Sequence, residues 1–432
     1  MEFLEVTEYE RIPRTDENHK FLSRLQRFDE GRCASGGERV FDWNDCRFVR
    51  AKNFVGVIAV PEGVVEILPK IDKSGSQKDR AQHNLLYMLS ITRKIVGEER
   101  DLASVGTQRM SLLEQVIAVF ASRTLSELKK GIDHCYVSHE ENIRCLKGKL
   151  VLREQITRNA VHRERAFCRY DDFISDTPIN RIIKASCRRL LSLSKVGLTQ
   201  KTLREVIFSL DEVTDLEVEE HHFSGIHYSR NTERFRLLID FSLMVLKGIS
   251  PSWSVGKDVT FSLLFPMEEL FEEFIARYIY RHADYYQIAR HHVHVQAVGF
   301  RKWLLRRDDD SGAFRLKPDL IIVNPDGTPK LILDTKWKHL LSDQEDRKNG
   351  VSQGDIYQLY AYAHRYGCQD NVLLFPSVGG VSPKSYFIEG NKQNHQIRIE
   401  FLMLNRDLRK DWKEFRRDLF RILKPGVEVP EG

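Results

Sequence analysis

The chain has 432 residues, more than one ordinary hydrophobic core accommodates, so two or three domains are expected. Hydrophobic residues make up 41% of it and charged residues 30%, which is typical of soluble globular proteins, and the net charge is +5. No apolar run is long enough to cross a bilayer, and the acidic, mixed N-terminus does not resemble a secretory signal, so we expect neither a membrane protein nor a secreted one.

The first half of the chain begins with β-type segments and continues with helical patterns. Residues 54–60 and 64–71 flank a Pro-Glu-Gly turn and predict a β-hairpin. Apolar residues then recur at three- and four-residue spacing, which predicts helices within residues 82–132, 178–194 and 231–247. The stretch GISPSWS after residue 247 is rich in loop-forming residues and is the predicted domain boundary.

The remaining residues predict an α/β domain of roughly 180 residues, a usual domain size. Its predicted elements are a helix at 266–282, a strand at about 292–300, a loop around residues 308–312, a hairpin within 317–338, a helix at 355–366, a strand at 372–376, a further short strand and a basic C-terminal helix. The mixture of hairpin, helices and later strands gives the fold class, α/β or α+β.

The seven cysteines are scattered and never form a C-x-x-C pair. An odd number without paired spacing indicates reduced thiols rather than a disulfide framework or a zinc site. We therefore expect a cytoplasmic protein.

Basic residues concentrate in two stretches, residues 144–169 and 301–307. Such clusters can neutralise phosphates, so they predict contact with a nucleic-acid backbone. The alternative is a basic, solvated surface without a ligand.

The segment KPDLIIVNPDGTPKLILDTKWK places acids at the ends of two apolar strands. If its Asp-Gly pair forms the centre of a type I′ turn, Asp319 lies directly opposite Asp334 and Lys336 points to the same side. Directly opposed Cβ atoms are roughly 4.5–5.5 Å apart, so the carboxylates would repel each other without a cation. Mg²⁺ suits such ligands, because it takes one or two carboxylates and keeps water and substrate oxygens. The alternative is a surface hairpin in which Asp319 caps a turn and Lys336 is solvated.

Two predicted helices carry further candidate residues. On PMEELFEEFIARYI, Glu272 lies at the flank of the apolar face and could supply a third carboxylate, whereas Glu273 points nearly away. That apolar face consists of Met267, Phe271, Phe274, Ile275 and Tyr278. On DIYQLYAYAHRYG, Gln358 and Tyr362 share a face and can hydrogen-bond a phosphate or a carboxylate. The alternatives are an exposed glutamate and ordinary core packing of the tyrosine.

Other patterns give weaker signals. In the sequence His291-His292-x-His294, a predicted strand, a polar face is favoured over zinc because no cysteine is nearby. No G-x-x-x-x-G-K-[ST] sequence is present, so we expect this chain to bind no nucleotide. A motor driven by nucleotide hydrolysis would therefore have to be a separate partner protein.

Three features resemble the PD-(D/E)XK nuclease superfamily, the last of them its RecB-like branch: the Pro-Asp pair at Asp319, the Asp-Thr-Lys triplet at 334–336 and the QxxxY helix at 358–362. Over nearly the whole chain, the sequence also resembles McrC, the nuclease component of McrBC modified-cytosine restriction systems. The passages that carry this resemblance are RAKNFVGVIAVPEGVVEILPKI, EENIRCLKGKLVLREQITRN, LFPMEELFEEFIARYI, KPDLIIV with LILDTKWK, and DIYQLYAYA.

The resemblance implies a C-terminal nuclease domain in residues 250–432. It further implies a β-rich region for partner docking in residues 1–110 and a mainly helical region for partner or DNA contact in residues 111–249. The implied partners are double-stranded DNA and a ring of McrB, an AAA+ GTPase that recognises methylated DNA and that McrC stimulates.

The resemblance also implies a function for each candidate residue. Asp319, Asp334, the Thr335 carbonyl and Glu272 would bind Mg²⁺, for which Mn²⁺ can substitute. Lys336 would position or activate the attacking water. The remaining two residues, Gln358 and Tyr362, would hold the substrate or the acidic side chains in the correct orientation.

Two other functions stay open at this point. The nuclease fold could serve only as a DNA clamp in a non-cutting activator of an AAA+ ring. The chain could also be a RecB-like repair nuclease that acts at DNA ends with a helicase. Cutting of closed circular DNA would disfavour the second, and loss of cutting on Asp334→Ala would disfavour the first.

Overall fold

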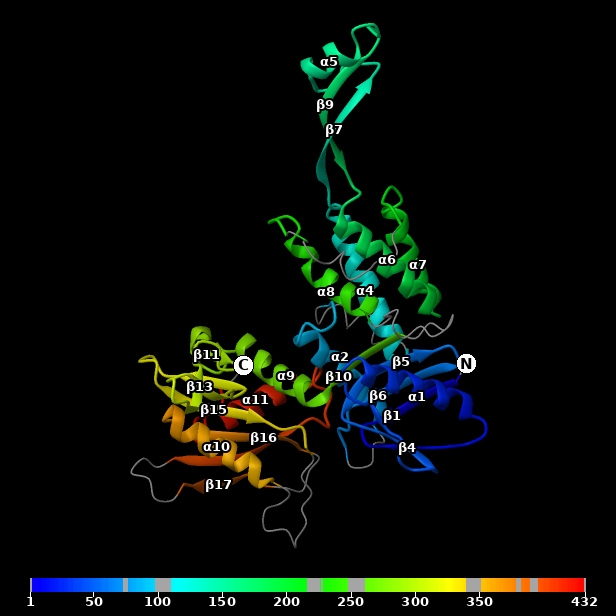
Figure 1. Cartoon of the computed structure of the whole chain (residues 1–432). Helices are drawn as coiled ribbons and strands as arrows, with labels where there is room; N and C mark the ends of the chain where they lie inside the picture. The colour runs from blue at the N-terminus through cyan, green and yellow to red at the C-terminus, as the bar shows by residue number, and fades with distance from the viewer. Residues whose placement is uncertain are drawn as a thin grey trace. The chain divides into compact units, whose positions relative to one another are not determined.

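The computed structural model describes residues 2–72, 77–97, 110–215, 226, 228–247, 261–338, 351–377, 382–388 and 395–430. The chain forms two compact units, one of residues 1–112 with 249–432 and one of residues 113–248 (Figure 1). The predicted boundary just after residue 247 lies outside the described residues. All seven cysteines are described and are free thiols, as predicted. Within the described ranges, no helix is both long and apolar enough to span a membrane.

The first unit contains a four-stranded sheet in the order β1–β6–β5–β10. These strands are β1 (Glu2–Thr7), β6 (Gly63–Leu68), β5 (Phe54–Val60) and β10 (Phe261–Pro266). The predicted hairpin of β5 and β6 is confirmed, with Val60 opposite Gly63. Strand β10, from the C-terminal half of the sequence, pairs antiparallel with β5 and so lies in one sheet with the N-terminal strands.

Further elements complete the N-terminal part of this unit. Helix α1 (His19–Ala34), which the sequence did not predict, buries Phe21, Leu22 and Leu25 in a core shared with the sheet. The others are β2 (Arg11–Pro13), β4 (Phe48–Ala51) and β3 (Phe41–Asp42), which form a three-stranded sheet, and helix α2 (Lys78–Ile91).

The same unit contains a six-stranded sheet in the order β11–β14–β15–β16–β18–β17. Its strands are β11 (Val293–Val295), β14 (Leu320–Val323), β15 (Pro329–Thr335), β16 (Asp370–Ser377), β18 (Gln396–Met403) and β17 (Lys384–Phe387). The contacts of β15 with β16 and of β16 with β18 are parallel, and the other pairings are antiparallel. This mixed arrangement agrees with the predicted α/β class.

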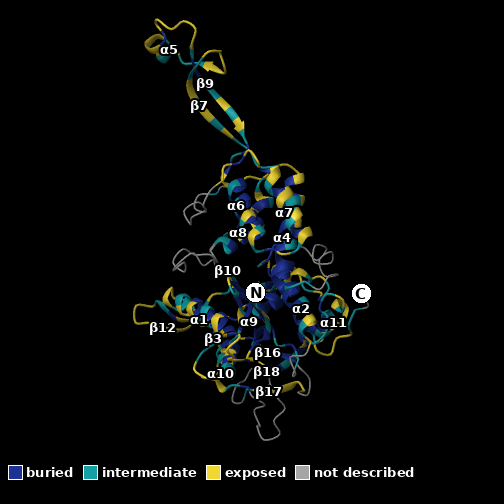
Figure 2. Cartoon of the chain, turned by 90° about the vertical axis from the view of Figure 1, so that its right-hand side faces the viewer, coloured by how far each residue is buried: buried dark blue, intermediate teal, exposed yellow. Residues whose placement is uncertain are grey.

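Helices cover this sheet. Helix α10 (Gln353–Tyr366) packs Leu359 and Tyr362 into a core with Ile332 and Leu373 of the sheet. Helices α9 (Met267–Arg281) and α11 (Trp412–Leu423) contact β15 and β18 and pack together, with the Phe274 and Phe415 ring centroids 5.8 Å apart. The predicted apolar face of α9 is buried throughout. Figure 2 shows the central strands of this sheet in the colour of buried residues.

The predicted strand at 292–300 is wrong in length. Residues 290–292 form a short 3-10 turn, and β11 spans only three residues. Gln296 and Ala297 both have φ near +51°, which a continuing strand does not allow, so β11 ends there. The predicted loop around 308–312 joins two strands that were not predicted, β12 (Lys302–Arg306) and β13 (Gly312–Leu316).

The second unit combines a helical body with a β-ribbon. Its helices are α4 (Leu112–Lys129), α6 (Pro178–Leu193), α7 (Gly197–Ser209), the 3-10 turn η2 (Glu233–Phe235) and α8 (Arg236–Lys247). Strands β7 (Cys135–Ile143) and β9 (Ala166–Ile174) form a ribbon that projects from these helices, with β8 (Lys149–Leu150) and α5 (Leu152–Arg158) at its far end (Figures 1 and 2). The basic stretch 144–169 forms this far end.

Candidate active site

The hairpin of β14 and β15 sets the two candidate aspartates against each other. Leu320 lies opposite Leu333, and continuing this register by one residue places Asp319 opposite Asp334. This is the pairing that the sequence predicted. It brings two acids together at the edge where β14 begins and β15 ends.

The turn that produces this register is not the predicted one. The Gly327 N–H donates to the Asn324 carbonyl at 2.9 Å, so the turn centres on Pro325 and Asp326. Asp326 has a negative φ, which excludes type I′, and only Gly327 is left-handed, with φ +82°. A bulge between Ile322 and Val323 then shifts the pairing by one residue. Turn and bulge together restore the register that a type I′ turn would have given.

Asp319 is fixed by the strand that carries Asp334. Its Oδ2 accepts a hydrogen bond from the Thr335 backbone N–H at 2.7 Å and another from the Thr335 hydroxyl at 2.8 Å. Asp319 and Thr335 are both buried. The carboxylate therefore has one defined orientation. The sequence interpretation considered only the Thr335 carbonyl and missed these two donors.

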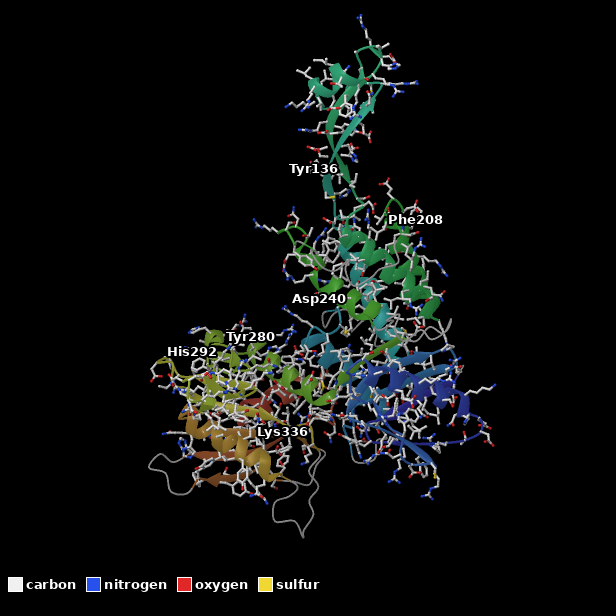
Figure 3. The ribbon with its side chains drawn as sticks, in the orientation of Figure 1. Tyr136, Phe208, Asp240, Tyr280, His292 and Lys336 are labelled. Carbon is white, nitrogen blue, oxygen red and sulfur yellow. The ribbon has the colours of Figure 1, made fainter. Side chains whose placement is uncertain are left out.

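Asp334 is almost fully buried, with 1% of its side chain exposed, and contacts both a lysine and a glutamine. Lys336 Nζ lies 2.7 Å from Asp334 Oδ2, and the lysine side chain keeps 24% exposure. Gln358 Nε2 approaches Asp334 Oδ1 at 3.4 Å and donates to the Tyr362 hydroxyl at 2.6 Å. Figure 3 labels Lys336 just beyond the end of β15. The structure thus brings these four predicted residues together.

Gln296 links the third candidate acid to this cluster. Its backbone N–H donates to the Asp319 carbonyl at 2.7 Å, and its side-chain amide donates to Glu272 Oε1 at 3.1 Å. Glu273 instead pairs with Lys94 at 2.9 Å and Arg277 at 2.6 Å. Of the two glutamates, Glu272 is the one connected to the aspartates. Gln296 was not predicted from the sequence, because only the pairing of β11 with β14 in the folded chain brings it beside Asp319.

The electrostatics of the cluster show an excess of negative charge. Burial raises the pKa of Asp319 well above its usual range, and Asp334 and Glu272 raise it further. Burial also raises the pKa of Asp334, against the lowering effect of Lys336. Burial lowers the pKa of Lys336, but Asp334, together with Asp319 and Asp355, outweighs burial and the net shift is upward. One lysine therefore does not offset the acids, and Asp355, which the sequence analysis also missed, adds to the imbalance.

These residues fit Mg²⁺ better than a transition metal. Their donors are carboxylate and carbonyl oxygens, the hard ligands that Mg²⁺ takes in small number while keeping several waters. In the part of the chain that the structure describes, no group of three or more His, Cys, Asp or Glu side chains is placed so that it could hold a metal ion.

The histidine sequence does not join this cluster. His291 and His292 lie in the 3-10 turn, which corrects the prediction of one strand over all three histidines, and only His294 lies in β11. His294 Nδ1 lies 3.2 Å from the Val298 carbonyl. Figure 3 shows His292 well apart from Lys336.

Comparison with known proteins assigns the chain to a family. The model of the McrBC 5-methylcytosine restriction system component matches residues 49–376. The chain belongs to this family. The match includes the hairpin and Gln358 and Tyr362 on α10.

Individual McrBC relatives agree with this assignment. The type IV methyl-directed restriction enzyme EcoKMcrBC of Escherichia coli K12 is 21% identical over 320 residues, which cover 71% of this chain and 89% of that protein. A chain of the tetradecameric assembly of Thermococcus gammatolerans McrB AAA+ hexamers with bound McrC superposes with a TM-score of 0.71 at 21% identity, covering 98% of this chain and 100% of its own. A chain of the T. gammatolerans McrBC complex gives 0.56 at 22% identity, covering 65% and 88%. The fold is therefore McrC-like.

Proposed function

We propose that this chain is the Mg²⁺-dependent DNA endonuclease subunit of a 5-methylcytosine-dependent restriction complex. Its six-stranded sheet with α9, α10 and α11 would be a PD-(D/E)XK nuclease domain. The observation that carries the proposal is the convergence of Asp319, Asp334 and Lys336 at one end of the β14–β15 hairpin. Buried acids with raised pKa values beside a lysine are typical of functional sites.

Asp319, Asp334, the Thr335 carbonyl and Glu272 would hold the metal. When bound, Mg²⁺ polarises a phosphodiester and lowers the pKa of a bound water. Thr335 holds Asp319 in one orientation through two donors. That preorganisation means the carboxylate need not reorient when the substrate arrives.

Lys336 would act on the attacking water and on the phosphate. Its ammonium group lies beside Asp334 and retains some exposure, so it can donate to a water or to a phosphate oxygen. Gln358 would orient Asp334 through its amide, and Tyr362 would fix Gln358 by accepting its other hydrogen bond. Each residue thus has a contact that accounts for its part in the reaction.

The proposed partners are an McrB-like AAA+ GTPase ring and double-stranded DNA. Support for the ring comes from the named assembly of the T. gammatolerans relative. The chain has no P-loop sequence, so the partner would bind and hydrolyse the nucleotide and would read the modified base. Basic residues of 144–169 would contact the DNA backbone, which carries no sequence information by itself.

The test is a cleavage assay with the chain and its partner reconstituted. Closed circular plasmid containing 5-methylcytosine is compared with unmodified plasmid, in Mg²⁺ with GTP or ATP. We expect double-strand cutting of the modified plasmid with GTP. Cutting restricted to linear ends would instead support a repair nuclease. Partner activation without cutting would support a non-cutting activator.

A further inference from the structure

The residue after Lys336 is held by a different part of the fold. Trp337 is buried, with 5% exposure, and its ring packs against Phe271 of α9 at a centroid distance of 5.2 Å. Its indole N–H donates to Glu8 Oε2 at 2.9 Å. Lys336 itself is fixed through its backbone N–H, which donates to the Leu374 carbonyl at 2.9 Å. The chain at Lys336 is therefore anchored by β16 on one side and by Trp337 on the other.

Glu8 lies at the end of the N-terminal sheet. It directly follows β1, and its backbone N–H donates to the Leu68 carbonyl at 3.0 Å. Glu8 Oε2 also accepts from the Lys70 backbone N–H at 3.2 Å. The hydrogen bond between Glu8 and Trp337 thus links the end of the β1–β6 pair to the end of β15, and its two residues are more than three hundred positions apart in the sequence.

Burying Glu8 is costly. The side chain is 1% exposed, and Oε1 has no hydrogen-bond partner among the described residues. A buried polar atom without a partner loses its hydrogen bonds to water and gains none in return. Burial raises the pKa of this carboxyl to about 8, so its neutral form prevails at neutral pH. Glu8 is costly to bury, and its carboxyl group bonds Trp337, the residue next to Lys336. This combination indicates that Glu8 does more than fill the core.

We propose that Glu8 is a positioning residue for the cleavage site, acting through Trp337 on the placement of Lys336 and, through Phe271, on that of Glu272. The inference rests on the proposed nuclease function of Lys336 and Glu272. Glu8 does not touch the reacting atoms. It fixes the indole ring of Trp337, the residue that follows Lys336, and this ring packs against Phe271, the residue that precedes Glu272.

The chain contains a matched control contact. Asp29 in α1 is fully buried, and its Oδ2 accepts from the Trp43 indole N–H at 2.8 Å. It also accepts backbone hydrogen bonds from Val40 and Phe41. The Trp43 ring of this pair packs against the N-terminal core, a cluster of buried residues that includes none of β15. Asp29→Ala measures the loss of stability when a buried carboxyl group is removed together with its indole and backbone hydrogen bonds.

The experiment uses the assembled complex and the variants Glu8→Ala, Glu8→Gln, Trp337→Phe and Asp29→Ala. The first readout is the kcat and KM of cleavage of modified plasmid. The second readout is the rate at which an acylating reagent labels Lys336, followed by mass spectrometry, which requires no DNA cutting. The double variant Glu8→Ala with Trp337→Phe completes a cycle.

We expect Glu8→Ala to lower kcat about 10- to 100-fold with little change in KM, because small misplacements of reacting groups have effects of this size. Lys336 labelling should accelerate as its pairing with Asp334 loosens. Trp337→Phe should change kcat and the labelling rate as much as Glu8→Ala does. The double variant should have a kcat no lower than that of either single variant. Glu8→Gln should restore most activity, since its amide oxygen can accept from the indole. Asp29→Ala should lower the Tm without changing kcat or labelling.

Wild-type kcat and wild-type Lys336 labelling in Glu8→Ala or Trp337→Phe would overturn the inference, as would additive effects in the double variant. The two proposals fail separately. If the wild-type complex cuts no DNA, the proposed function fails, while the labelling rates still decide whether Glu8 positions Lys336. If the complex cuts DNA and Glu8→Ala behaves like Asp29→Ala, only the positioning inference fails.

Discussion

Thr335 donates both its backbone N–H and its hydroxyl to a single oxygen of Asp319, at 2.7 and 2.8 Å. Thr335→Val keeps the shape and the backbone donor but removes the hydroxyl. A hydrogen bond to a charged group contributes about 1.5–3 kcal/mol, so we expect cleavage to slow about 10- to 100-fold. The hydroxyl lowers the pKa of Asp319, so its loss should also raise the Mg²⁺ concentration required for half-maximal cleavage.

A matched control for this variant lies in the same hairpin. The Thr328 hydroxyl donates to Asp326 Oδ1 at 2.6 Å in the exposed turn. Thr328→Val should leave the Mg²⁺ requirement unchanged. An equal Mg²⁺ requirement in Thr335→Val and wild type would contradict the assigned role of the Thr335 hydroxyl.

Substitutions of two adjacent glutamates, Glu272 and Glu273, show which of them is the third acid of the site. Glu272→Gln removes charge beside Asp319 and Asp334 and should raise the Mg²⁺ requirement and lower cleavage about 10-fold or more. Glu273→Gln loses ion pairs with Lys94 and Arg277, which are partly exposed, and should change cleavage little. Titrating cleavage against Mg²⁺ for both variants separates them. A larger defect in Glu273→Gln would reverse the assignment.

The pairing of β5 with β10 depends on a glycine. A Cβ on Gly56 would lie 1.9 Å from the Leu263 carbonyl oxygen, and Gly56 has φ +133°. We expect Gly56→Ala to lower the free energy of unfolding by about 3 kcal/mol or more, because both the strand and its partner must move. Thermal denaturation measures this effect.

Gly327→Ala is the comparison for Gly56→Ala. Gly327 is also left-handed, but a Cβ there meets nothing within 4 Å. Gly327→Ala should lower the free energy of unfolding by only about 1 kcal/mol, because the strained backbone conformation is its single cost. Equal losses for the two variants would show that the close approach of β10 to β5 does not exist in solution.

Stability should depend on pH through Glu8. Its pKa is about 8 in the folded chain against an ordinary value of 4.5, so the folded state binds the proton more tightly. Stability from this group is therefore complete below pH 4.5 and is lost as the pH rises toward 8, a change on the order of a few kcal/mol. Glu8→Gln cannot titrate, so it should be more stable than wild type at pH 8.5, with a smaller difference at pH 5. Denaturation at both pH values measures this, and parallel losses in both proteins would contradict it.

Local pattern was sufficient to predict which of these side chains lie close together. The helical spacing of α10 placed Gln358 beside Tyr362, and the apolar face of α9 distinguished Glu272 from Glu273. The hairpin register was predicted although its turn was not, because a left-handed Gly327 and a bulge compensated for each other. Agreement in the register therefore did not depend on the turn that was assumed.

Contacts between distant segments could not be predicted in this way. Gln296 reaches Asp319 only because β11 pairs with β14, and two left-handed residues end β11 just there. The Glu8–Trp337 bond joins residues more than three hundred positions apart. The ribbon of β7 and β9 was not predicted either, because its exposed and half-buried residues form no apolar face that would indicate strands.

The most direct test of the central claim is single-turnover cleavage of modified closed circular plasmid by complexes that contain wild-type chain, Asp334→Asn or Asp326→Asn. Asp326 lies exposed in the turn of the same hairpin and serves as the control for handling and assembly. We expect Asp334→Asn to assemble normally and to cut at least about 1,000-fold more slowly, since loss of a metal-binding carboxylate removes several kcal/mol of transition-state stabilisation. Asp326→Asn should cut as wild type does. Undiminished cutting by Asp334→Asn would show that the hairpin acids do not carry the chemistry.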